Sequence, residues 1–92
     1  MEPTEVRVWL VERTYSDDEQ NLIILTYATP DGSRSFRKER ALPSFTGSRR
    51  ATPVSIEVDR SNLGTVADEE TRERYAAEVE RMRANHDRDG TL

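Results

Sequence analysis

The chain has 92 residues, of which 34% are hydrophobic and 35% are charged, and its net charge is −4. This length allows one domain with a modest core, and the lack of cysteine excludes disulfides and thiolate metal sites. No apolar run exceeds the four residues from Leu22 to Leu25, and the N-terminus lacks a basic segment followed by an apolar one. We therefore expect neither a membrane span nor a signal peptide, and a cytoplasmic protein.

The basic residues are thirteen arginines and a single lysine, Lys38. Such an arginine-rich composition is typical of a GC-rich genome or of a surface adapted to high salt, and both fit a halophilic archaeon or an actinobacterium. The segments TYSDDEQNLIILTYATPDG (residues 14–32) and RERYAAEVERMRANHD (residues 72–87) resemble small proteins of halophilic archaea that have no assigned function. This resemblance supports the habitat and implies no activity.

Four segments predict β-strands. Residues 5–15 alternate between two faces and are rich in β-branched and aromatic side chains. Residues 21–29 are apolar on both faces, which indicates a central strand covered on both sides. Residues 33–42 are mostly charged, which is typical of an edge strand, and residues 54–59 alternate as a half-buried strand does.

Two local signals complete the predicted fold. The pair Asp31-Gly32 suits the left-handed backbone that closes a hairpin between the second and third strands. A helix is predicted from about residue 68 to about residue 85. Thr65 and Asp68 can form a capping box at its start, or Asp68 is itself the N-cap. Its apolar stripe is narrow and consists of Tyr75, Val79 and Met82. Residues 86–92 are expected to form a flexible tail.

The order ββββα predicts an α+β fold: one domain, residues 1–92, in which a four-stranded antiparallel meander carries a C-terminal helix on one face. One helix covers one face, whereas the first two strands are apolar on both. A sheet curled into a small barrel, the loop 43–53, or a second chain would cover the other face. We expect the second chain, in a homodimer. The predicted interface consists of Trp9, Val11, Ile23, Leu25 and Tyr27.

A basic segment, residues 33–53, carries a charge of +5, so the rest of the chain carries −9. Cations grouped in this way contact phosphate backbones in nucleic-acid-binding proteins. Along the predicted strand the charge is split, because Arg34, Lys38 and Arg40 share a face with Phe36 while Arg37 lies with Glu39. A solvated strand edge followed by a flexible loop explains the segment better than a binding site does. The candidate anion or nucleic-acid site is Arg34, Arg37, Lys38, Arg40, Arg49 and Arg50.

The element order, together with SRRATPVSIEV (residues 48–58) before and in the fourth strand, is similar to the single-stranded-DNA-binding fold of the Whirly coactivators. Those proteins dimerise. The resemblance rests on topology. It implies a single-stranded nucleic acid as the ligand of the basic segment.

Signals for an enzyme are poor. The only histidine, His86, follows the predicted helix, and the carboxylates near Asp17 and Asp68 lie in polar settings that do not raise a pKa. Trp9 and Tyr27 would line the pocket of a ligand-binding protein or enzyme, which is a third hypothesis. The sequence predicts a small non-catalytic binding or regulatory module that acts through protein contacts, without cofactor or metal; single-stranded nucleic-acid binding is the alternative.

Overall fold

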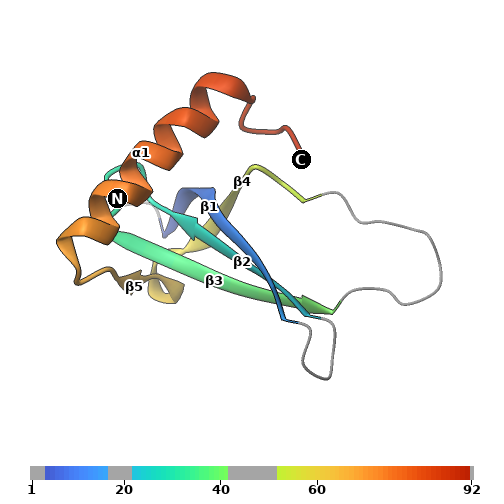
Figure 1. Ribbon diagram of the computed structural model, residues 1–92, viewed down its shortest axis with the longest axis horizontal. Coiled ribbons are helices and arrows are strands. Elements are labelled where there is room, and N and C mark those ends of the chain that lie inside the picture. The colour runs from blue at the N-terminus through green and yellow to red at the C-terminus, as the bar shows by residue number, and fades with distance from the viewer. Residues whose placement is uncertain (1–3, 17–21, 42–51, 92) are drawn as a thin grey trace.

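The computed structural model describes residues 4–16, 22–41 and 52–91, except for the side chains of residues 15, 16, 22, 40 and 41. The described elements are the strands β1 (Glu5–Ser16), β2 (Leu22–Ala28), β3 (Arg34–Ala41), β4 (Ser55–Asp59) and β5 (Gly64–Thr65), the short 3₁₀-helix η1 (Arg60–Asn62) and the helix α1 (Glu69–Asn85) (Figure 1). In this part of the chain no helix has the length and apolarity needed to cross a membrane.

The predicted α+β class, with an antiparallel sheet and a C-terminal helix on one face, is confirmed (Figure 1). The order of the strands is β4-β1-β2-β3-β5. β4 therefore pairs with β1 and not with β3 as in the predicted meander, and a fifth short strand extends β3. Three hairpin-connected strands with the fourth returning beside the first form a Greek key. This pairing sets Val58 opposite Val6 and Ile56 opposite Val8, so that β4 extends an apolar face of β1.

The sheet is curled. β4 and β5 lie at opposite edges of the sheet, and only the residues of η1 and Leu63 separate Asp59 from Gly64. In a flat sheet these edges would be about 19 Å apart, which is four strand spacings. A link that contains a 3₁₀ turn, with a rise of about 2 Å per residue, cannot span that distance. The sheet therefore has a concave and a convex side, as in an open barrel, which was one of the predicted alternatives.

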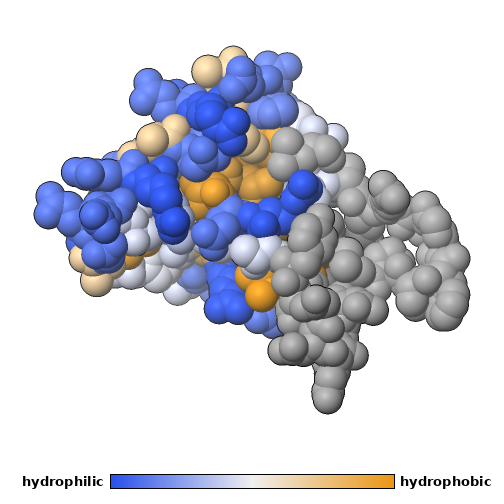
Figure 2. All heavy atoms as spheres, viewed as in Figure 1, coloured by the Kyte–Doolittle hydropathy of each residue, from blue (hydrophilic) through white to orange (hydrophobic). Residues whose placement is uncertain are grey.

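The helix lies over the face of the sheet that carries Trp9. We assign this face as the convex one, because the opposite face carries most of the large buried side chains of the strands, as the inner side of a curled sheet does. Trp9 pairs with Ala28, and the Arg83 guanidinium lies 6.0 Å from the centroid of the Trp9 ring. The Arg74 guanidinium lies 3.7 Å from the carboxylate of Glu12 on the same side. Figure 2 shows apolar surface between α1 and the strands beneath it, bordered by polar side chains. The concave side holds most of the large apolar core side chains of the sheet, which are Val8, Leu10, Ile23, Leu25, Tyr27 and Val58.

A β-bulge at Val11 changes the faces of β1. Leu10 pairs with Tyr27, whereas Glu12 already pairs with Thr26, so β1 has one residue more than β2 at this point. An extra residue moves every later side chain to the opposite face. Glu12 consequently lies on the convex side, and Arg13 lies on the concave side. Strict alternation had predicted Arg13 on the face of Trp9.

The residues of the predicted dimer interface do not share a face. Trp9 is 7% exposed under α1, whereas Leu25, 1% exposed, and the fully buried Tyr27 belong to the concave side. Ile23 lies with them, and Val11 occupies the bulge. The chain covers both faces by curling and by its helix, so the exposed apolar face that motivated a dimer is absent from the described residues. The homodimer remains a prediction, but the five residues named for its interface do not form one surface.

The predicted flexible tail is instead bonded to the sheet. The amide of Gly90 donates to the carbonyl of Asp87 at 2.8 Å, and this turn presents the Gly90 carbonyl to the amide of Val54 at 3.0 Å. Thr91 forms a bridge with Pro53. Val54 is fully buried, so its amide needs an acceptor within the chain. In Figure 1 the C-terminus accordingly lies beside the start of β4.

Candidate anion-binding surface

Cationic side chains of β1 and β3 lie on the concave side of the sheet, on either side of β2. The register sets Arg13 on β1 opposite Leu25 on β2, and Leu25 opposite Lys38 on β3. Residues paired in this way point to the same side of a sheet. Two strand spacings separate the Cα atoms of Arg13 and Lys38 by about 10 Å. Both side chains are exposed, so their charged groups lie in water on either side of the buried Leu25.

Arg34 adds a third cation to this side. It stands four residues before Lys38 on β3, which is about 13 Å along the strand, and two residues before Phe36, which shares its face. Arg34 is exposed, whereas Phe36 is half-buried and packs against the core. We call Arg13, Arg34 and Lys38 together the concave cations.

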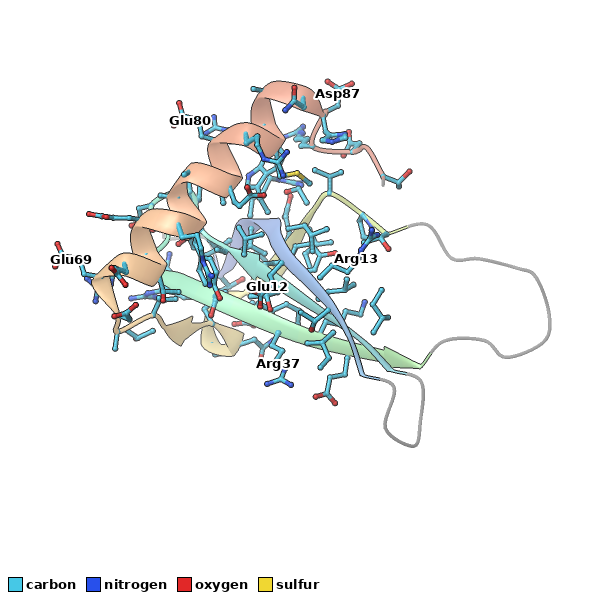
Figure 3. The ribbon with its side chains drawn as sticks, in the orientation of Figure 1. Glu12, Arg13, Arg37, Glu69, Glu80 and Asp87 are labelled. Carbon is cyan, nitrogen blue, oxygen red and sulfur yellow. The ribbon has the colours of Figure 1, made fainter. Side chains whose placement is uncertain are left out.

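Among the described strand residues, the concave cations have no acidic neighbours on their face. None of the three forms an ion pair with another described residue. On the convex side, by contrast, three ion pairs join strand residues to residues of opposite charge: Arg7–Glu57 at 2.8 Å, Arg37–Glu39 at 3.4 Å and Arg74–Glu12 at 3.7 Å. In Figure 3, Glu12 lies below the helix, and Arg13 lies to the right of Glu12.

The predicted basic site is only partly assembled. Arg34 and Lys38 share the concave side, and Arg37 lies on the convex side with Glu39, as alternation along β3 predicted. The backbone of Arg40 pairs with Ile23, but its side chain falls outside the described atoms. Arg49 and Arg50 lie outside the described residues. Arg13 was not predicted as a site residue, because no residue in β1 indicates the bulge that places the Arg13 side chain on the concave side.

The surface offers charge and little aromatic area. Trp9 and Tyr27, which were expected to line a ligand pocket, belong to the core, and the hydroxyl of Tyr27 donates to the carbonyl of Pro53 at 2.9 Å. Cationic side chains with few aromatic neighbours favour contacts with phosphate oxygens over the reading of bases.

The carboxylates with lowered pKa belong to turns and caps. Hydrogen bonds from Thr29 and Ser33 lower the pKa of Asp31 to about 2, within the β2–β3 turn. Hydrogen bonds from Thr71 lower the pKa of Asp68, which caps α1 as predicted. Each shift follows from hydrogen bonds within a turn or a helix cap, mainly from a threonine hydroxyl, so neither identifies an acid or base for catalysis. In the described part of the chain, no three acidic or histidine side chains gather as metal ligands would.

Comparison with known proteins gives a family. A search of the curated proteins and a search of the solved structures found no match. Residues 2–92 match the family model described as "Family of unknown function (DUF7967)", and the chain belongs to this family.

Proposed function

We propose that the protein is a small non-catalytic module that binds the phosphate backbone of single-stranded nucleic acid. Its family assigns no activity, so the proposal rests on the candidate anion-binding surface. The ligand lies on the concave side and contacts Arg13, Arg34 and Lys38. One observation carries the proposal: the charged side chains of the described strands on this side are all cations, exposed and without ion pairs to other described residues, whereas three cations on the convex side pair with carboxylates. Unpaired cations on one face attract a polyanion.

The spacing of the cations favours a chain of phosphates over a single small anion. Arg13 and Lys38 are about 10 Å apart across the sheet, and Arg34 and Lys38 about 13 Å apart along β3. Two of these long side chains can converge on one phosphate group, but cations spread over about 13 Å of the surface make more contacts with a chain of phosphates. A polymer with a phosphate on every residue contacts all three. The proposal therefore names a nucleic acid.

The curvature of the surface favours a single strand. Duplex DNA is stiff, with a persistence length of about 50 nm, and follows a small concave surface only at a cost in bending energy. A single strand adapts to a groove through its flexible backbone. Because Trp9 and Tyr27 lie in the core, we expect binding to depend on charge and to show little preference for sequence.

A module that acts through protein contacts is the second candidate. It is favoured by an edge of β3 that is free of strand partners beyond Ser35 among the described residues. Free strand edges are a recurring site for binding an extended segment of another protein.

Fluorescence anisotropy with a labelled oligothymidylate tests the proposed function. The triple variant Arg13→Gln/Arg34→Gln/Lys38→Gln removes the concave cations, and the control Arg74→Gln/Arg81→Gln/Arg88→Gln removes equal charge from exposed residues of the helix and tail. We expect the wild-type protein and the control to bind in low salt. In the concave variant the slope of log K against log salt concentration should fall by about 2, at roughly 0.7 per phosphate contact.

Three results would contradict the proposed function. If the wild-type protein leaves the anisotropy unchanged at low salt, or if the two triple variants lose affinity equally, the concave side is not the site. A duplex of the same length provides the second arm. Tighter binding of that duplex than of the single strand would contradict the assignment of a single-stranded ligand.

A further inference from the structure

The free edge of β3 has the hydrogen-bonding groups and the charges to pair with itself. We propose that two copies of the chain join edge to edge through β3, antiparallel, about a two-fold axis at Lys38. The interface differs from the one expected from the sequence, and it does not rest on the proposed function.

The backbone of β3 presents unused groups at alternate residues. The amide of Thr29 donates to the carbonyl of Arg34 at 3.0 Å, so Arg34, and with it Phe36 and Lys38, directs its backbone groups toward β2. The carbonyl of Ser33 accepts from the amide of Val66 at 2.8 Å on the opposite edge. The amide and carbonyl groups of the odd-numbered residues of β3 therefore point outward. Beyond Ser35, these residues have no strand partner among the described residues.

The free edge is short and its centre is defined. β5 pairs with Arg34 and Ser35 and blocks this end of the edge, and β3 ends at Ala41. Residues 36–40 are left, with Lys38 in the middle. A second copy laid antiparallel on this edge then sets Arg37 opposite Glu39 of the second copy, and Glu39 opposite Arg37 of the second copy. Both are pairs whose backbones exchange two hydrogen bonds.

The side chains at these positions are complementary in charge. Arg37 and Glu39 lie on the convex side, and their side chains are 64% and 54% exposed. Opposite charges placed across neighbouring strands stabilise the pairing, and like charges destabilise it. A shift of the axis by one residue in either direction sets Arg37 against Arg37 or Glu39 against Glu39. Charge thus selects the register centred on Lys38.

Lys38 opposes itself in this register and weakens the dimer. Residues at the axis form a pair without mutual hydrogen bonds, whose side chains approach most closely. Two ammonium groups meet there, on the concave side. An edge contact of this length also buries much less surface than a permanent interface does. The proposed dimer is weak and exchanges rapidly with the monomer.

Disulfide trapping tests the dimer, since the chain has no cysteine of its own. Paired residues without mutual hydrogen bonds have Cα atoms about 4.5 Å apart, within the range that a disulfide requires. The variant Lys38→Cys removes the repulsion and places one thiol at the axis. We expect it to form a covalent dimer under mild oxidation at least ten times faster than Arg88→Cys, whose thiol would lie on the exposed tail.

Charge reversal tests the register within the same background. Adding Arg37→Glu to Lys38→Cys sets Glu against Glu in both pairs and should slow the crosslinking to the rate of the control. Adding Arg37→Glu together with Glu39→Arg exchanges the charges and should restore the fast rate. Equal rates for Lys38→Cys and Arg88→Cys overturn the proposed dimer, and failure of the double exchange to restore the rate overturns its register.

Discussion

Gly32 is the residue at which the β2–β3 turn meets the helix. Its φ is +73°, and a Cβ atom added there would overlap the carbonyl of Arg72 in α1. We expect Gly32→Ala to cost about 1–2 kcal/mol from the backbone conformation alone, with a further cost because the helix must move. The melting temperature should fall by roughly 4–8 °C for each kcal/mol lost.

Gly64→Ala is the matched control for this prediction. A Cβ atom at Gly64 would lie 4.0 Å from the carbonyl of Ser35, which is an ordinary contact, and the residue is exposed. Thermal unfolding followed by circular dichroism compares the two variants. Equal melting temperatures for Gly32→Ala and Gly64→Ala would show that the turn does not contact α1 as closely as described.

Asp31 gives the turn a dependence on pH. Its carboxylate accepts hydrogen bonds from the hydroxyl of Thr29 at 2.7 Å and from the amide and hydroxyl of Ser33 at 3.0 and 2.8 Å. These bonds lower its pKa to about 2 in the folded state. A lowered pKa means that the stabilisation is complete above the unfolded pKa of 3.8 and is lost as the pH falls through about 2.

The variant Asp31→Asn isolates this contribution. It keeps an acceptor oxygen but cannot titrate. Between about pH 4 and pH 2, the range between the unfolded and folded pKa of Asp31, the melting temperature of the variant should therefore change less than that of the wild-type protein. Other carboxylates, such as Asp59 and Asp68, titrate in both proteins and cancel in the difference. Parallel curves for the two proteins over this range would contradict the role of Asp31.

Single residues with strong local preferences were predictable from the sequence. The turn at Asp31-Gly32 and the cap at Asp68 follow from backbone chemistry within a few residues, and both predictions are confirmed. The face of Arg13 was not predictable. It depends on the bulge at Val11, which is fixed by how β1 pairs with a distant strand, and nothing within β1 signals it.

At the scale of elements, the bounds of the strands and helix agree closely with the predicted ranges because hydrophobic period and caps are local signals. The partner of β4 is a non-local property. Neighbouring strands in sequence usually pair, and that rule predicted β3. In the structure the inner edge of β4 pairs with β1, where the valines and isoleucine of the two strands meet.

The start of β4 depends on the C-terminal turn. The amide of Val54 donates to the carbonyl of Gly90, and Val54 is fully buried. Removal of residues 90–92 should cost about 1 kcal/mol for this hydrogen bond, with a fall of roughly 4–8 °C in melting temperature. Removal of Leu92 alone is the control. An unchanged melting temperature after the longer truncation would mean that the bond contributes nothing to stability.

At the scale of the whole molecule, the curl of the sheet decides which surfaces are available. The sequence indicated apolar residues on both faces of the first two strands, and this led to the expectation of a dimer. Curling encloses Leu25 and Tyr27 on one side, and α1 covers Trp9 on the other. The charged side chains that remain accessible on the concave side of the described strands are cationic. The candidate site thus follows from global curvature together with a bulge, which explains why the sequence predicted only Arg34 and Lys38 among the concave cations.

The central claim is that this concave side binds a phosphate backbone. Chemical-shift mapping of the ¹⁵N-labelled protein with unlabelled oligothymidylate at low salt tests it most directly. The account predicts the largest shifts at the amides of Arg13, Leu25, Arg34 and Lys38, and none at Glu57 or along the outer side of α1. Shifts centred on the helix or on the Arg7–Glu57 pair, or an unchanged spectrum, would contradict it.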